Sequence, residues 1–190
     1  MGKITLFFHI SLDGFVADAD GGLGWASLSE ELFSYVAQRI GAANTALYGR
    51  KTFEMMEGYW PTAADQPHAT KHDIEHASWY KTVRKVVISN TLPAGNPDGP
   101  TIIGKDLPAE IQQLRNGTGG EIPMFASPTA AHELMAQDLV DGYWLFVHPV
   151  ILGSGTSLFV PPHSFAKVRL VGSHAFENGV VCLDYERTTN

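Results

Sequence analysis

The chain has 190 residues, of which 44% are hydrophobic and 17% charged, so it contains enough apolar material for one sizeable core. Its net charge is −7 with only 13 Lys and Arg, which argues against a nucleic-acid partner because phosphate binding needs clustered cations. The lone Cys182 excludes an internal disulfide. The first apolar run ends at Asp13 and is too short for a signal segment or a membrane span, so we expect a cytoplasmic protein.

Strand and helix signals alternate along the chain without a linker or repeat, which predicts a single domain over residues 1–190. Residues 4–10 are apolar on both faces, as in a buried strand, and a Gly- and Asp-rich loop follows over residues 11–28. The next apolar stripe has helical spacing up to Ile40, and Gly41 is expected to stop that helix.

The remainder repeats this alternation in shorter pieces. Strands are predicted at 45–48, 85–89, 100–103, 122–126 and 143–150. Helices are predicted at 51–57, 72–82, 108–115 and from Ser127-Pro128 onward, where Ser is a natural N-cap and Pro a natural first residue. The tail is predicted as a hairpin of 167–174 and 180–187, because Asn178-Gly179 is typical of a tight turn.

This order of elements predicts an α/β fold with three layers, α/β/α, around a mostly parallel sheet. The C-terminal hairpin is expected to form an antiparallel edge. Sheets of this kind bind ligands beyond the carboxyl ends of their strands. The sequence therefore directs attention to the loops after Ile10, Tyr48, Ser89 and Ala126.

The segment after Tyr48 combines a glycine, two cations and a hydroxyl at a predicted helix start: Gly49, Arg50, Lys51 and Thr52. Free backbone N–H groups at a helix start favour an anion, and the two cations strengthen that preference. A phosphate site is one interpretation. A solvated Arg-Lys pair, with Thr52 as an N-terminal helper, is the other.

Ser89, Asn90 and Thr91 follow a buried strand, and small polar side chains at that place can hold a ribose or its phosphate. A turn or cap cluster explains the same residues. The Gly-rich run 153–155 is likewise explained by a tight turn as well as by a phosphate loop.

Two acidic residues, Glu30 and Glu31, open the first helix. The spacing from Ser27 to Glu30 fits a capping box, in which Glu30 bonds back to the Ser27 amide. The other interpretation is that Glu30, or Glu31 if Glu30 caps, serves as a catalytic acid once a cleft buries it.

His68, His72 and His76 are spaced four residues apart, which is how histidines on one helix share a metal. No further ligand is evident in this polar segment. We therefore expect no metal site.

Several blocks resemble the dihydrofolate reductase superfamily, and in particular its bacterial branch similar to the RibD C-terminal reductase domain of the riboflavin pathway. The blocks follow the family's order between residues 4 and 159. They are Ser11-Leu12-Asp13-Gly14-Phe15-Val16-Ala17, Gly49-Arg50-Lys51-Thr52-Phe53-Glu54, Val86-Val87-Ile88-Ser89, Asp138-Leu139-Val140-Asp141, His148-Pro149-Val150-Ile151-Leu152-Gly153-Ser154-Gly155 and Leu158-Phe159.

This resemblance implies NADPH as cofactor, hydride transfer to a heterocyclic or carbonyl-like substrate, and a homodimer. The implied phosphate contacts are Gly49, Arg50, Lys51 and Thr52, with Ser89 and Asn90 near the adenosine ribose and its 2′-phosphate. The implied nicotinamide contacts are His9, Val16 and Ala17, and the implied pyrophosphate loop contains Ala126, Ser127 and Thr129. Glu30 matches the acid that grips the pterin in dihydrofolate reductases, and a one-residue gap would make it Glu31.

The sequence departs from the family at two places. Where a Gly-Gly or Gly-Ser pair is usual it has Ala126-Ser127-Pro128, in which Ala126 adds a methyl group and Pro128 lacks a donor. The Ser127 hydroxyl either compensates for this or satisfies the helix start. The second departure is Asp141-Gly142, where Asp-Glu is more usual.

We therefore expect an NADPH-dependent reductase of a small, heterocyclic substrate of the folate- or riboflavin-precursor class. Its pocket is expected between the first helix and the loop 13–25, lined by Phe7, Trp25, Leu32, Phe33 and Tyr35. The alternative is a non-catalytic nucleotide- or small-molecule-binding protein with a degraded cofactor site. The apolar segments 144–150 and 158–162 are expected to supply the homodimer surface, and no membrane partner is expected.

Overall fold

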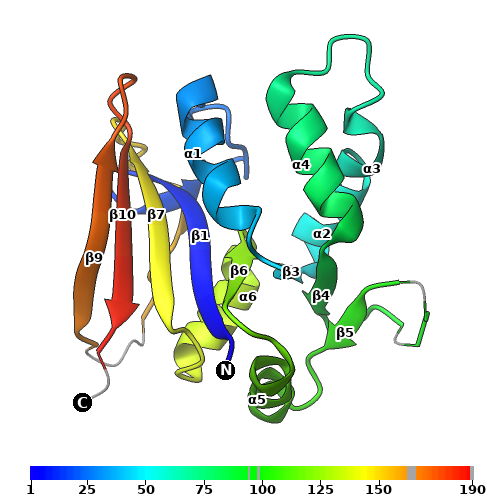
Figure 1. The fold of residues 1–190 in the computed structure, drawn as a ribbon. Helices are drawn as coiled ribbons and strands as arrows, with labels where there is room; N and C mark the ends of the chain where they lie inside the picture. Colours follow the sequence, from blue (N-terminus) through cyan, green and yellow to red (C-terminus); the bar gives the residue numbers. More distant parts are fainter. Residues whose placement is uncertain (94, 98, 162–165, 189–190) are drawn as a thin grey trace. The chain divides into compact units, whose positions relative to one another are not determined.

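The computed structural model describes residues 1–93, 95–97, 99–161 and 166–188 (Figure 1). The chain divides into two compact units. The first unit consists of residues 1–2 and 28–123, and the second of residues 3–27 and 124–190. No helix in the described ranges is long and apolar enough to cross a membrane.

The first unit contains parallel strands followed by helices. Its elements are α1 (Glu30–Ile40), β3 (Thr45–Gly49), α2 (Arg50–Glu57), α3 (Trp60–Ala63), α4 (Lys71–Thr82), β4 (Arg84–Ile88), β5 (Thr101–Ile103), α5 (Leu107–Gly117) and most of β6 (Glu121–Phe125). The strand order is β5-β4-β3-β6. Strand β4 pairs in parallel with both β3 and β5. The parallel β3–β4 pairing is allowed by the crossover through α2, α3 and α4 that joins these two strands.

The second unit places a parallel pair beside a hairpin. Its elements are β1 (Lys3–Ser11), β2 (Phe15–Ala17), α6 (Pro128–Ala136), β7 (Gly142–His148), β8 (Thr156–Ser157), β9 (Val168–Ala175) and β10 (Val181–Arg187). Strand β1 pairs in parallel with β7, which also pairs antiparallel with β10, and β10 forms the C-terminal hairpin with β9 (Figure 1). The mostly parallel sheet and its antiparallel edge are thus as predicted.

Strand β1 shows why the apolar runs fold as they do. Ile4 and Leu6 are completely buried and Phe8 is 3% exposed, so the side chains on this face of β1 are packed in the core and shielded from solvent. Each fully buried side chain of this size stabilises the fold by about 1.5–3 kcal/mol relative to its exposed state. On β7, Trp144 is also buried, and its indole N–H donates to the Cys182 sulfur over 3.0 Å. The lone cysteine is therefore a buried acceptor in the core.

Three local expectations need correction. The loop 11–28 contains the short strand β2, which pairs with β8 in a separate antiparallel ladder that the sequence did not predict. The short helix α3 was also not predicted. The capping box from Ser27 to Glu30 is wrong, because Ser29 is the N-cap and its hydroxyl accepts from the Leu32 amide over 3.2 Å.

The second departure from the family pattern has a structural reason. The Asp141 carboxylate accepts the Ile4 amide proton over 2.8 Å and so joins the starts of β1 and β7. A Cβ atom at Gly142 would lie 3.0 Å from the Tyr185 carbonyl oxygen. Glycine at this position therefore allows β10 to approach β7 closely.

Candidate functional site

In the first unit, two polar turns meet at the carboxyl ends of neighbouring strands. Gly49 at the end of β3 is in register with Ile88 at the end of β4. Helix α2 begins directly after Gly49, and Ser89 directly follows Ile88. Parallel pairing thus brings the predicted phosphate turn and the predicted ribose turn to one edge of this sheet.

The start of α2 offers both amide donors and charge. Its N-cap is Gly49, which has no side chain and so makes no side-chain cap hydrogen bond. Arg50 forms an ion pair with Glu54 one turn further, at 3.0 Å, and Lys51 is exposed. Uncapped amides beside two cations are a donor set that suits a phosphate group.

The Ser89 turn is closed by its own side chain. The Ser89 hydroxyl oxygen accepts from the backbone amides of Thr91, at 3.2 Å, and Leu92, at 3.0 Å. This is the turn arrangement that small hydroxyl residues favour. Asn90 is exposed, so its amide group is accessible at the same edge.

In the second unit, the turn between β6 and α6 has an unusual backbone. Ala126 has φ 43 and Ser127 has φ 65, both in the left-handed region that favours glycine. Ser127 is the N-cap residue of α6, as predicted, but its side chain makes no cap hydrogen bond. Its hydroxyl donates instead to the Phe125 carbonyl over 3.2 Å. Thr129 is exposed in the first turn of α6.

This turn also shows how the chain accommodates the first departure from the family pattern. The glycine-like conformations fall on positions 126 and 127, and Pro128 occupies the first helical position, where a missing N–H costs nothing. The backbone therefore adopts a conformation suited to Gly-Gly although neither residue is glycine. Each left-handed non-glycine residue costs about 1–2 kcal/mol.

Two histidines lie side by side on β1 and β7. His9 Nδ1 and His148 Nε2 are 2.9 Å apart, and His148 Nδ1 accepts the backbone N–H of Ser27 over 3.1 Å. The Ser27 amide is thereby occupied by His148 and not by Glu30. Burial, followed by the neighbouring His148, lowers the pKa of His9 to about 3, and burial lowers the pKa of His148. Both rings are neutral at pH 7.

Aromatic side chains surround this pair. The Phe7 and Phe146 rings lie 5.5 and 5.2 Å from the His9 ring, and Trp25 meets His148 edge-on at 5.5 Å. Phe7, His9 and Trp25 are partly exposed, whereas His148 is 1% exposed. Sequence reasoning assigned Phe7 and Trp25 to the substrate pocket but gave no role to His148.

The loop that carries Val16 and Ala17 is held by Asp13. The Asp13 carboxylate accepts from the Ser11 hydroxyl at 2.6 Å and from the Leu152 and Gly153 amides at 3.1 and 2.8 Å. These hydrogen bonds, the Ser11 bond first, lower the Asp13 pKa to about 2. The Gly-rich run 153–155 is therefore a docking point for this loop, which favours the tight-turn interpretation over a phosphate loop.

The remaining predicted residues lie on the first unit. Glu30 and Glu31 are exposed in the first turn of α1, so the burial that a catalytic acid was expected to need is not found there. Leu32 is completely buried in the core and does not line an open pocket, which corrects that assignment. Tyr35 is partly exposed, and Phe33 stacks on His72 with ring centroids 4.0 Å apart.

The histidine series is divided between a turn before α4 and an aromatic cluster. His68 precedes α4, and His72 and His76 belong to an aromatic cluster with Trp60. Burial lowers the pKa of His76 to about 3. Among the described residues no group of three or more His, Cys, Asp or Glu side chains is placed to hold a metal ion.

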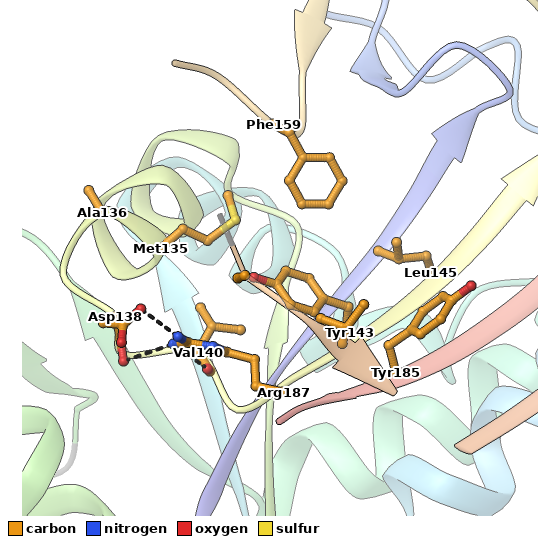
Figure 2. Close-up of a pocket in the computed structure, with 11 residues that line it drawn as sticks. Met135, Ala136, Asp138, Val140, Tyr143, Leu145, Phe159, Tyr185 and Arg187 are labelled. Carbon is orange, nitrogen blue, oxygen red and sulfur yellow. Dashed lines mark hydrogen bonds and ion pairs between the residues drawn. The ribbon is translucent and has the colours of Figure 1, made fainter. Parts of the chain in front are cut away.

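The second unit also contains a pocket of about 570 Å³ that no sequence motif indicated (Figure 2). Tyr143, Tyr185 and Phe159 supply aromatic walls. Arg187 forms an ion pair with Asp138 at 2.7 Å along one side. The pocket shares no lining residue with the predicted cofactor or substrate residues.

The parallel strands, the antiparallel edge hairpin and the polar turns at the strand ends define a dihydrofolate-reductase-like fold. The family model of the RibD C-terminal domain matches residues 2–182, and the chain belongs to this family.

Individual relatives agree with this assignment. The uncharacterised Bacillus subtilis protein YyaP is 28% identical over 187 residues, which cover 96% of this chain and 94% of YyaP. A putative riboflavin biosynthesis protein from Shewanella sp. PV-4 has a similar structure, with a TM-score of 0.74, 21% identity and coverage of 98% and 99% of the two chains. Dihydrofolate reductase from Enterococcus faecalis, complexed with NADP(H), gives a TM-score of 0.62 at 16% identity, over 98% and 97% of the chains.

Proposed function

We propose that this protein is an NADPH-dependent reductase that transfers a hydride to a small heterocyclic substrate of the folate- or riboflavin-precursor class. The observation that carries the proposal is the meeting of the Gly49 and Ser89 turns at one sheet edge, with uncapped α2 amides and two cations. The Enterococcus faecalis reductase of similar fold is complexed with NADP(H), which supports the choice of cofactor.

The donor set assigns distinct tasks to the residues of the first unit. Arg50, Lys51 and the amides at the start of α2 would hold phosphate groups, since charge-assisted hydrogen bonds are the strongest available. Ser89 and Asn90 would contact the ribose and its 2′-phosphate. The 2′-phosphate is present in NADPH and absent from NADH. Its negative charge is attracted by Arg50 and Lys51, so this site would favour NADPH over NADH.

For the second unit, the resemblance to the family implies that the backbone of Ala126 and Ser127 contacts the pyrophosphate and that His9, Val16 and Ala17 contact the nicotinamide. Bound NADPH supplies the hydride. The chain's own contribution is to orient the reacting groups and to keep water away from them, for which the half-buried aromatic residues Phe7 and Trp25 are suited.

One observation favours the alternative, a non-catalytic binding protein with a degraded cofactor site. The Cβ atoms of Ala126 and Ser127 stand where glycines would leave the backbone open to a pyrophosphate. Titration with NADPH and with NADH, followed by nicotinamide fluorescence, separates the two functions. The reductase proposal expects NADPH to bind at least about tenfold more tightly than NADH, or about 1.4 kcal/mol.

The same titration also shows when the reductase proposal is wrong. If neither nucleotide binds the wild-type protein but NADPH binds Ala126→Gly/Ser127→Gly, the site is a degraded one. If neither nucleotide binds either protein, the nucleotide-site assignment is wrong. If NADPH binds the wild-type protein as expected, a screen of heterocyclic substrates for NADPH oxidation follows.

We also propose that the protein is a cytoplasmic homodimer. The expected contact segment 144–150 needs correction, because Trp144 and Phe146 are 1% and 0% exposed; residue 162 of the second segment lies outside the described residues. Exposed apolar side chains occur instead on β9, where Val168, Leu170 and Val171 are 42%, 50% and 43% exposed. Light scattering after size exclusion tests the dimer, and a mass near 20.7 kDa contradicts it.

A further inference from the structure

The hydrogen bonds around His148 allow only one placement of protons on the two neighbouring histidines. The Ser27 backbone N–H can only donate, so His148 Nδ1, 3.1 Å away, must accept. Neutral His148 therefore carries its proton on Nε2 and donates it to His9 Nδ1 over 2.9 Å. Neutral His9 must then carry its own proton on Nε2.

Charging either ring would break this chain of donors. A second proton on His148 would point an N–H at the Ser27 N–H, and a second proton on His9 would point an N–H at that of His148. Burial also disfavours the charged forms and lowers the pKa of both rings. The proton on His9 Nε2 is thus set by hydrogen bonding and by the low polarity of the surroundings together.

Ser27, the first donor in this series of hydrogen bonds, is held in place by Asn178 at the tip of the C-terminal hairpin. The Asn178 side-chain amide donates to the Ser27 carbonyl at 3.0 Å and to the Ser27 hydroxyl at 3.2 Å. The tip of the C-terminal hairpin thereby anchors Ser27, the residue whose N–H orients His148. This gives the orientation of His9 a supporting structure that begins far from its own strand.

The last donor in this series of hydrogen bonds, His9 Nε2–H, has no protein acceptor among the described residues. Within the described part of the chain, His9 Nε2 makes no hydrogen bond, and the His9 ring is partly exposed beside the partly exposed Phe7 ring. His9 Nε2 is not among the described polar atoms that are both fully buried and unpartnered, so an acceptor on a bound molecule can reach it. A planar molecule lying against Phe7 would be in a position to supply one.

We propose that His9 Nε2–H recognises the ligand of this site, and that it selects a planar heterocycle or carbonyl compound that presents a ring nitrogen or a carbonyl oxygen as acceptor. His148 and the Ser27 amide are positioning groups, because they set the tautomer of His9 and do not touch the ligand. The proposed function places His9 near the nicotinamide, where the substrate to be reduced must also lie. Only the identification of this ligand with that substrate rests on the proposed function.

The first test measures the tautomers directly in the intact, ligand-free chain. Long-range proton–nitrogen NMR of the ¹⁵N-labelled protein at pH 7 is expected to show both rings neutral with the proton on Nε2. His148→Phe is expected to leave His9 as a mixture of tautomers. His148→Gln is expected to restore the single form, since its amide oxygen can accept from Ser27 and its amide nitrogen can donate to His9. A proton on Nδ1 of His9 in the wild-type chain overturns the proposal without any variant.

The second test compares two bicyclic probes of similar size. Isoquinoline presents a ring-nitrogen acceptor, whereas indole presents only a donor. Isoquinoline is expected to bind at least about threefold more tightly, the effect of one hydrogen bond of about 0.7 kcal/mol, and to shift the His9 Nε2–H resonance. His9→Phe is expected to abolish the preference while keeping the ring. Equal binding, absence of binding, or a preference that survives in His9→Phe overturns the proposal.

Neither probe contains a nicotinamide nucleotide, so the two proposals fail separately. If NADPH binds and the tautomer or probe result is negative, only the role of His9 is wrong. If the tautomers and the probe preference are as expected but no nucleotide binds, only the reductase function is wrong.

Discussion

The turn after β3 and the turn after β6 each lead from a strand into a helix, but they differ in glycine content and in backbone conformation. The first contains Gly49, whose φ of −84 any residue can adopt, and its distinctive feature is the charge of Arg50 and Lys51. The second has no glycine, yet Ala126 and Ser127 both have positive φ. Glycine in a turn therefore does not imply a left-handed backbone, and its absence does not exclude one. Charge marks the first turn, and backbone conformation marks the second.

The largest effect is expected at a glycine that neither turn requires, Gly155. It has φ 136, and a Cβ atom there would collide with the Ala17 carbonyl oxygen. Gly155→Ala is expected to lower the free energy of unfolding by about 3 kcal/mol or more, because strain and a backbone clash act together. Gly153→Ala is the matched control, since Gly153 has φ 73 but no atom within 4 Å of its Cβ position. Its expected loss is about 1 kcal/mol. Urea denaturation measures both, and equal losses would show that the contact with Ala17 contributes nothing.

The charged turn is tested by removing both cations. Arg50→Ala/Lys51→Ala is expected to weaken NADPH binding at least about 30-fold, or about 2 kcal/mol, because two charge-assisted phosphate contacts are lost. Lys71→Ala is the control, since Lys71 is an exposed lysine at the start of α4. Isothermal titration measures all three proteins. If the double variant and the control change equally, the turn after β3 does not hold phosphate.

The strained turn is tested by restoring glycine. Ala126→Gly and Ser127→Gly are each expected to stabilise the protein by up to about 1 kcal/mol, the left-handed strain of 1–2 kcal/mol less the entropy cost of glycine. Ala130→Gly, inside α6, is expected to destabilise by about 1 kcal/mol or more. Thermal unfolding gives the three values. Destabilisation by glycine at 126 and 127 would contradict the positive φ angles reported for this turn.

The smallest effect concerns the ion pair that competes for Arg50. Glu54→Gln removes the carboxylate that Arg50 contacts at 3.0 Å. Because an exposed pair at this spacing is worth about 0.3–0.5 kcal/mol, NADPH is expected to bind about twofold more tightly. Glu75→Gln, which removes the partner of Lys71, is expected to leave the affinity unchanged. Titration at low ionic strength gives the best chance to see the difference, and weaker binding would show that Glu54 supports the site.

Much of the fold follows from local patterns. The both-face apolar run of β1, the short strand containing Val86 and Val87, and the hairpin around Gly179 were predicted within a few residues, because burial and turn chemistry act over short stretches. The hairpin turn shows this well, since Gly179 has φ 83 and its amide donates to the Phe176 carbonyl over 2.9 Å. The polar residues at the start of α2 were also found at the predicted strand end, because they lie together in sequence.

Other features depended on partners that the local sequence does not contain. The capping-box prediction for Glu30 was wrong because the Ser27 amide bonds to His148, a residue 121 positions away. Ser127 was correctly predicted as the N-cap of α6, but its left-handed backbone, with a side chain that makes no cap hydrogen bond, was not. The short ladder pairs β2 with β8, and beside it the Gly153 amide donates to Asp13, 140 positions away.

The sequence by itself determined the family, the order of strands and helices, and the composition of the turn after β3, because hydrophobic periodicity and turn residues are local properties. The tertiary structure alone decided the pairing of His9 with His148, 139 residues apart. That contact exists because β1 and β7 pair in parallel, with His9 opposite Phe146 and Ser11 opposite His148. The proton positions on the two rings follow from the contact, so no pattern in either strand alone predicts the donor that His9 presents.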